Sequence, residues 1–227
     1  MLTEPQTDAA LMALDRAVAE AVRDRLAAPT HVHPDAQAIT LRQTLAGLTA
    51  AQSATVRAVL GRIDAGQGLP LVVWGPSAQV LAADRFGLSA RVAAEPEQAL
   101  AAVRSGSRAL LDLTPAKAWW GRLLAEPALR IVGALPDDRH GVPRALMVQQ
   151  TPPGPTGDDR TFWVTDSPAA DTRIVETLSA SGLAATPLIA AGGLKLFTLA
   201  GYVQAEDVRL IDAPGILNGI IGAAPLF

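Results

Sequence analysis

Cysteine is absent from the 227 residues, which excludes disulfide bonds, catalytic thiolates and cysteine-ligated zinc sites. Lysine is nearly absent as well, since the chain contains only Lys117 and Lys195. Binding of an anion would therefore depend on arginine. The 19 basic residues are interspersed with 22 acidic ones, and the formal net charge is −3. The sequence therefore lacks a dense basic patch of the kind that binds nucleic acid, and we expect no nucleic-acid partner.

Long apolar runs are missing too. Stretches such as Leu69–Trp74 and Ile220–Phe227 are far shorter than the roughly 20 residues that cross a bilayer, so we expect no membrane partner. Met1–Thr7 is acidic and polar, unlike a signal peptide, and the cytoplasm is the expected compartment. The glycine-rich motifs of nucleotide-binding proteins and the Gly-x-Ser-x-Gly motif of hydrolases are also absent, which leaves both classes without support.

Apolar side chains are plentiful. Hydrophobic residues make up 49% of the chain and charged residues 18%, which is enough to build a core. Residues 8–68 predict helices, because apolar residues recur there at the three- and four-residue spacing of one helix face. Further helices are expected over Ala36–Ala46 and Ala50–Ala65, the second capped by Thr49. These helices need a surface on which to bury their apolar faces, which favours a homodimer.

The remainder of the chain predicts sheets. Residues 69–151 alternate apolar strands with short helices, which indicates a small α/β lobe with a largely parallel sheet. After a linker rich in proline and glycine, residues 160–227 predict the order βαββαβ, a ferredoxin-like domain that could also pair between subunits. The predicted fold class is therefore α/β (α+β), with an N-terminal helical segment, a small parallel-sheet lobe and a C-terminal ferredoxin-like βαββαβ domain.

Several short strings match a known architecture. They are Gly75-Pro76 with the following Ala82-Ala83, residues 99–106 (ALAAVRSG), Val142–Val148, Gly157–Thr161 and Ile221–Pro225. Together with the order of the segments, they resemble the bacterial chorismate mutase–prephenate dehydratase family with its C-terminal ACT regulatory domain. The resemblance implies a mutase-like helical segment over residues 8–68, a truncated dehydratase-like lobe over 69–151 and an ACT-like domain over 160–227.

The sequence also departs from that family. Ser77–Val80 replaces the family's Gly-Thr-Phe-Ser, and only Arg144 remains of its Thr-Arg-Phe motif. Residues 75–151 leave room for roughly one small lobe, so the cleft between two lobes is missing and dehydratase activity is not expected. The ACT-like segment has Ala169-Ala170-Asp171 and Ile189–Gly192 in place of the phenylalanine-binding motifs, so phenylalanine binding is not expected either.

Mutase chemistry needs no metal, nucleophile or cofactor. The enzyme must hold a dicarboxylate in a reactive conformation, a task to which the forked guanidinium group is suited. The candidate catalytic residues are Arg16, Arg23 and Arg57, of which the first two lie seven residues apart on one helix face. The segment has no lysine to meet the ether oxygen. The alternative is that these arginines solvate the outer faces of ordinary amphipathic helices.

Other candidates concern ligands and metals. Ser77, Arg139 and Arg144 are the candidate ligand-binding residues of the second segment. His31 and His33 have a spacing that could hold a metal, but a solvated loop is the preferred interpretation and no metal is expected. The pair Trp119-Trp120 could line a pocket, although core packing is favoured because tryptophan contributes a large buried area.

We therefore predict a chorismate mutase-like protein of phenylalanine biosynthesis that forms a homodimer and that, if active, is an isomerase converting chorismate into prephenate with no cofactor. The alternative is a catalytically inactive regulatory or small-molecule-binding protein, a pseudoenzyme that retains the dehydratase and ACT architecture and takes a small-molecule carboxylate as its ligand. An unrelated ligand-binding α/β protein is a third interpretation. A mutase would bring at least two arginines together in one helical pocket, whereas an inactive relative would leave them in solvent.

Overall fold

The computed structural model describes residues 8–27 and 33–227. Three helices begin the chain: α1 (Ala9–Ala27), α2 (Pro34–Leu45) and α3 (Ala50–Gln67). Thr49 caps α3 as predicted, because its hydroxyl accepts from the Gln52 amide while the Gln52 side chain accepts from the Thr49 amide. None of the described helices is long and apolar enough to cross a membrane.

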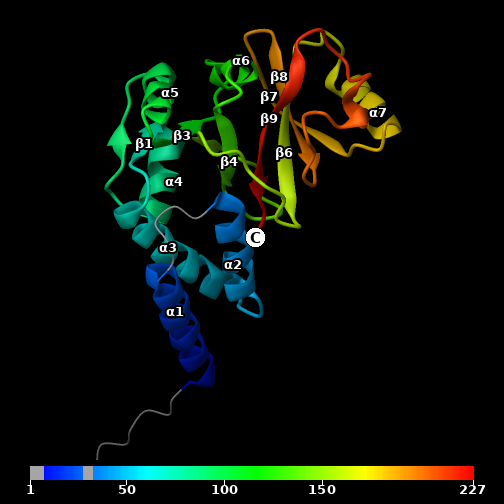
Figure 1. Cartoon of the computed structure of the whole chain (residues 1–227). Coiled ribbons are helices and arrows are strands. Elements are labelled where there is room, and N and C mark those ends of the chain that lie inside the picture. The colour runs from blue at the N-terminus through cyan, green and yellow to red at the C-terminus, as the bar shows by residue number, and fades with distance from the viewer. Residues whose placement is uncertain (1–7, 28–32) are drawn as a thin grey trace, which may run out of the picture.

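The rest of the chain builds one sheet that curls across the molecule (Figure 1). Its nine strands are β1 (Leu71–Trp74), β2 (Arg91–Val92), β3 (Arg108–Asp112), β4 (Arg130–Leu135), β5 (Ala145–Gln149), β6 (Asp159–Thr165), β7 (Ala185–Ala191), β8 (Leu194–Ala200) and β9 (Asn218–Pro225). Their order is β2-β1-β3-β5-β4-β9-β6-β8-β7. The pairs β1–β2, β1–β3 and β4–β9 are parallel, and the other pairs are antiparallel.

The predicted fold class is wrong. The strands assigned to a small parallel lobe and to a separate ferredoxin-like ACT domain form a single mixed sheet instead. The connection between β4 and β5 covers residues 136–144 and contains no helix, so β5 turns back antiparallel to β4 rather than crossing over to a parallel position. The helix expected near Gln204–Val208 is a 3₁₀ turn over Val208–Leu210, and β9 pairs with β4 as well as with β6.

Helices cover both faces of the sheet. On one face, a core cluster runs through both halves of the sheet. It is covered by α5 (Pro96–Arg104), the 3₁₀ turn Trp119–Gly121 and α6 (Arg122–Ala125). Trp119 and Trp120 are buried there, which confirms the core interpretation of this pair. The opposite face carries two separate clusters, one under α4 (Pro76–Phe86) and one under α7 (Asp171–Ala180).

The N-terminal helices lie beside one end of the sheet, and α1 projects away from it (Figure 1). Helix α3 packs closely on the end of α4, because Gly61 has no side chain where a Cβ would clash with the carbonyl oxygen of Arg85. Helix α2 lies next to the C-terminus of the chain (Figure 1). The helices therefore cover the stretch of sheet between α4 and the end of β9.

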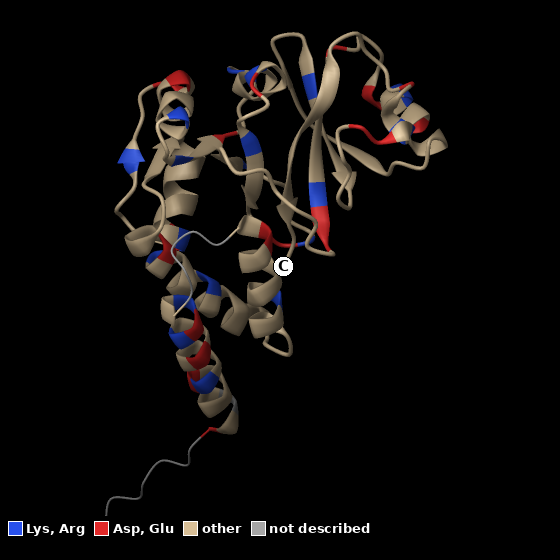
Figure 2. Ribbon diagram, in the orientation of Figure 1, with Lys and Arg blue, Asp and Glu red and all other residues tan. Residues whose placement is uncertain are grey.

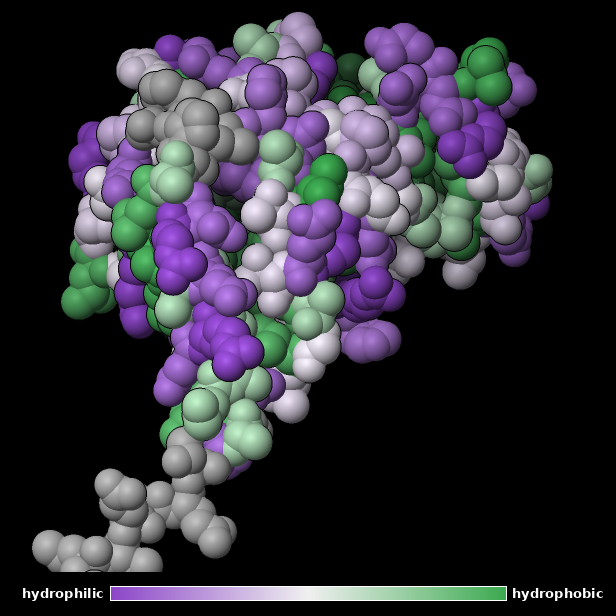
Figure 3. Space-filling model, turned by 60° about the horizontal axis from the view of Figure 1, so that its bottom comes forward, coloured by the Kyte–Doolittle hydropathy of each residue, from purple (hydrophilic) through white to green (hydrophobic). Residues whose placement is uncertain are grey.

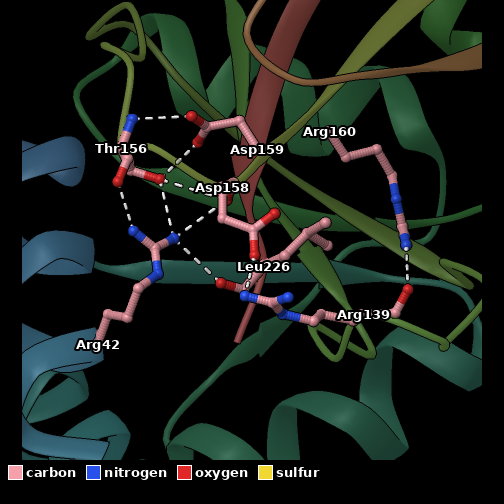
Figure 4. Close-up of polar contacts among 7 residues, drawn as sticks. All are labelled: Arg42, Arg139, Thr156, Asp158, Asp159, Arg160 and Leu226. Atoms are coloured by element: carbon pink, nitrogen blue, oxygen red, sulfur yellow. Dashed lines mark hydrogen bonds and ion pairs between the residues drawn. The ribbon is translucent and has the colours of Figure 1, made fainter. Parts of the chain in front are cut away.

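A single arginine ties α2 to the sheet. Arg42 donates to the carbonyl oxygens of Thr156, Asp158 and Leu226 and to the hydroxyl of Thr156, over 3.0–3.1 Å for all but the Thr156 carbonyl (Figure 4). Its guanidinium carbon also lies 5.7 Å from the centre of the Phe227 ring. Thr156 is held in turn by Asp159. The carboxylate of Asp159 accepts hydrogen bonds from the amide of Thr156 at 2.8 Å and from the hydroxyl of Thr156 at 2.6 Å. Arg42 thus joins α2 to the start of β6 and to the end of β9.

The two halves of the sheet meet where β9 lies against β4. The pairing places Gly222 opposite Ile131, at a φ of +142° that disfavours any residue with a side chain. A Cβ on Gly222 would clash with the backbone nitrogen and oxygen of Ile131 and would lie 2.8 Å from its Cα. Only glycine lets the two strands approach this closely.

Gly222→Ala should therefore lower the free energy of unfolding by at least about 2 kcal/mol, because it adds a clash to an unfavourable φ. Gly201→Ala is the matched control: its φ is +81° and open space surrounds the position of its Cβ. Chemical denaturation measures both. Equal losses of unfolding free energy in the two variants would show that backbone strain alone causes the destabilisation. The close approach of β4 and β9 would then make no contribution.

Arg42→Met should lower the free energy of unfolding by about 2–4 kcal/mol, because three carbonyl groups lose a charged donor. Arg62→Met removes an exposed arginine from α3 and serves as the control. If the two variants have the same denaturation midpoint, Arg42 does not hold α2 in place.

Candidate functional site

A cavity of about 230 Å³ lies between the N-terminal helices and the sheet. Its walls come from α1, α2, α3, the end of α4, strands β3, β4 and β5, and the last residues of the chain. Most of the lining is apolar and includes Leu41, Leu60, Phe86, Leu135, Met147 and Phe227. Seen from the side of the helices, by contrast, the surface shows many hydrophilic side chains (Figure 3).

Four arginines from four different elements reach this cavity: Arg25, Arg57, Arg85 and Arg108. Arg25 of α1 forms an ion pair with Asp64 of α3. Arg57 and Arg85 share one carboxylate, that of Asp137, which follows β4; the N–O distances are 2.5 and 2.8 Å. Burial lowers the pKa of the Arg85 guanidinium, and the charge of Asp137 opposes this shift.

Arg108, the first residue of β3, has no such carboxylate. The residue is 9% exposed, and its buried Nε and Nη2 atoms make no hydrogen bond to any described residue. The guanidinium carbon lies 4.9 Å from the centre of the Phe86 ring, a cation–π contact. Burial lowers the pKa of Arg108; nearby Asp64 opposes the shift and Arg25 adds to it. The arrangement can accept an anion, because buried polar groups are rarely left without a partner.

A second cavity of about 260 Å³ adjoins the first. The two share Arg108, Arg25, Asp64 and both glutamines Gln37 and Gln149. The second cavity is lined mainly by polar groups, in contrast to the apolar walls of the first. Arg108 therefore stands at the boundary between an apolar compartment and a polar one.

The structure does not bring the three candidate catalytic residues together. Arg16 and Arg23 are exposed on α1, a helix that carries charges of both signs along its length (Figure 2), and neither lines the cavity. Arg57 does line it, paired with Asp137. The arginine of α1 that reaches the cavity is Arg25, four residues after the buried Ala21 and so on the same helix face.

None of the candidate ligand-binding residues of the second segment lines either of these two cavities. The amides of Ser77 and Ala78, in the first turn of α4, donate to the carboxylate of Asp112 at 3.0 and 2.6 Å, so an internal anion already occupies that helix end. Burial raises the pKa of Asp112, and these two hydrogen bonds oppose the shift. Arg139 is exposed and pairs with Asp158 at 2.5 Å (Figure 4), and Arg144 is exposed before β5.

One signal for the site was visible in the sequence. Arg108 opens a run of apolar residues that predicts a buried strand, and a charged residue within such a strand is unusual unless it has a partner. Residues of one strand alternate between its two faces, so Arg108 shares the face of Leu110, which packs in the cluster under α4. The sequence does not indicate that α3 and α1 would cover that face.

No cluster of side chains suited to a metal ion occurs in residues 8–27 and 33–227. His33 lines the second cavity. His31, the other residue considered for a metal, lies outside the described residues.

Comparison with known proteins found no matching family model and no matching curated protein. Among solved structures, the chain is similar to one described as "GqqA- a novel type of quorum quenching acylases", with 19% sequence identity and a TM-score of 0.47. The match covers 69% of this chain and 95% of that chain. A likeness this distant says nothing about the function of the present protein.

The single mixed sheet corrects the architecture expected from the family resemblance, because its strands form neither a separate dehydratase-like lobe nor a separate ACT domain. The comparisons give no support to chorismate mutase or to aromatic amino-acid biosynthesis. The chain is thus a mixed α/β protein with an arginine-lined cavity between its N-terminal helices and its sheet.

Proposed function

We propose that this protein binds a small organic carboxylate in the cavity between helices α1–α3 and the sheet. The observation that carries this proposal is Arg108, whose buried Nε and Nη2 atoms lack a hydrogen-bond partner among the described residues. A buried cation without a counter-ion costs several kcal/mol of folding free energy. A carboxylate placed against the guanidinium fork would supply both the missing charge and the missing acceptors.

The surrounding charges favour a carboxylate over a phosphate. Asp64 and Asp137 stand in the same walls as the arginines, and Asp24 also lines the cavity. Three carboxylates face four guanidinium groups, which leaves about one positive charge to be balanced. A phosphate monoester, which carries roughly −1.5 to −2 charges at neutral pH, would be repelled by these aspartates. A singly charged carboxylate balances the site.

The binding function matches the alternative of a small-molecule-binding or regulatory protein. No catalytic step is part of the proposal, because Arg16 and Arg23 lie in solvent and away from the cavity. A cytoplasmic location stays a prediction.

Arg108→Met should separate a binding role from a structural one. In the absence of ligand, it should raise the free energy of unfolding by about 1–3 kcal/mol, because a buried charge without a partner is removed. Sodium benzoate and sodium hexanoate should stabilise the parent protein, and the substitution should abolish that stabilisation. Thermal denaturation over a range of carboxylate concentrations, at constant ionic strength, measures both effects.

Arg91→Met, which removes an exposed arginine from β2, is the control and should behave as the parent does. A less stable Arg108→Met variant that still responds to the carboxylates would contradict the proposal.

We also propose a second copy of this chain as a partner. Leu11 and Met12, near the free end of α1, are 56% and 50% exposed, and such large apolar side chains on a projecting helix are suited to burial against another subunit. Light scattering at micromolar concentration is expected to give the mass of a dimer, and Leu11→Gln with Met12→Gln the mass of a monomer. A stable monomer of the parent protein would refute the pairing.

A further inference from the structure

The pairing of charges limits the ligand to one negative group. Arg25 is engaged by Asp64, and Arg57 and Arg85 are both engaged by Asp137. A second carboxylate on the ligand would have to displace one of these aspartates from an existing pair. Arg108 remains the one cavity arginine whose guanidinium has no paired carboxylate among the described residues.

The walls near Arg108 define the rest of the ligand. The ring of Phe86 lies 4.9 Å from the guanidinium, so the apolar surface begins directly beside the charged group. Leu135, Met147 and Phe227 continue that surface. A polar or charged substituent placed against these side chains would be desolvated without a partner. The ligand therefore has an uncharged, apolar body.

The two cavities set the direction in which such a ligand lies. Gln37 and Gln149 line both cavities, and their amides can donate to the remaining lone pairs of the carboxylate that Arg108 holds. The apolar body then extends into the first cavity, towards Phe227 at the end of the chain.

The volume of the first cavity bounds the size. An apolar protein cavity of about 150 Å³ holds benzene, which has six non-hydrogen atoms. By the same ratio, a cavity of about 230 Å³ holds about nine non-hydrogen atoms. This size corresponds to an unbranched acid of seven carbons or to benzoic acid.

We infer that the ligand is an amphipathic monocarboxylic acid of this size, bound with its carboxylate at Arg108 and its apolar body along Phe86, Met147 and Phe227. The inference rests on the proposed carboxylate-binding function and narrows it to one class of acid. It excludes dicarboxylates, including substrates of the kind that a chorismate mutase would hold.

Isothermal titration calorimetry of the full chain with four probes tests the ligand class. Heptanoate is the matching acid, heptanedioate adds a second carboxylate at the same length, 1-heptanol removes the charge, and butanoate shortens the body. Heptanoate should bind at least about tenfold more tightly than each of the other three, a difference of about 1.4 kcal/mol. Arg108→Met should lose heptanoate binding, and Arg91→Met should keep it.

A second variant tests the direction of the ligand. Phe227→Ala removes part of the apolar wall that the inferred pose assigns to the longer body, so it should weaken heptanoate binding about tenfold and leave butanoate binding unchanged. Equal losses of binding affinity for heptanoate and butanoate would overturn the assigned direction of the ligand. Circular dichroism of each variant confirms that a lost signal does not reflect unfolding.

The outcomes distinguish the inference from the function on which it rests. Binding of heptanedioate as tight as that of heptanoate, still abolished by Arg108→Met, would overturn the monocarboxylate class and keep the carboxylate site. Equal binding of heptanoate and 1-heptanol, or heptanoate binding that Arg108→Met leaves unchanged, would overturn both. Absence of any heat with either acid at millimolar concentration would also overturn both.

Discussion

The close approach of β9 to β4 is the constraint on which the rest of the structure depends. Because Gly222 lies against the backbone of Ile131, strands from residues 71–149 and from residues 159–225 share one sheet. Register shifts flank the junction in both β4 and β6, as expected where a curled sheet changes direction. The cavity depends on this continuity, because its walls include residues of β4 and β5 together with Pro225 and Phe227.

The helices complete the cavity through a few specific contacts. Gly61 allows α3 to lie against the end of α4, and this brings Arg57 and Asp64 next to Arg85. Arg42 then fastens α2 to the start of β6 and the end of β9, so the helix that forms one side of the cavity is fixed to both ends of the C-terminal segment. Both Nη atoms of Arg42 have acceptors and only its Nε lacks one, whereas neither Nε nor Nη2 of Arg108 has a partner among the described residues. The two arginines illustrate the difference between a structural and a ligand-facing role.

The candidate site could be predicted only in part. Helical periodicity indicates which residues of α1 share a face, but it does not decide which face meets the sheet. The face with Ala21 and Arg25 packs inward, so Arg25 reaches the cavity while Arg16 and Arg23 remain exposed. Arg57, predicted as one of the arginines of the helical segment, reaches the cavity because it lies in α3, which packs on α4. The backbone amides of Ser77 and Ala78 donate to the carboxylate of Asp112, a residue distant in sequence whose approach the local pattern does not indicate.

The sequence by itself determined the local elements: the three N-terminal helices, the Thr49 cap, most of the strands and the burial of the tryptophan pair. These follow from apolar spacing, capping residues and turn residues, which act over a few positions along the chain. The tertiary structure decided which strand edges pair, that β5 and β9 join both halves into one mixed sheet, and that Arg108 is buried beside a cavity. Strand pairing and the burial of a charge depend on residues far apart in sequence, and local patterns carry no information about such neighbours.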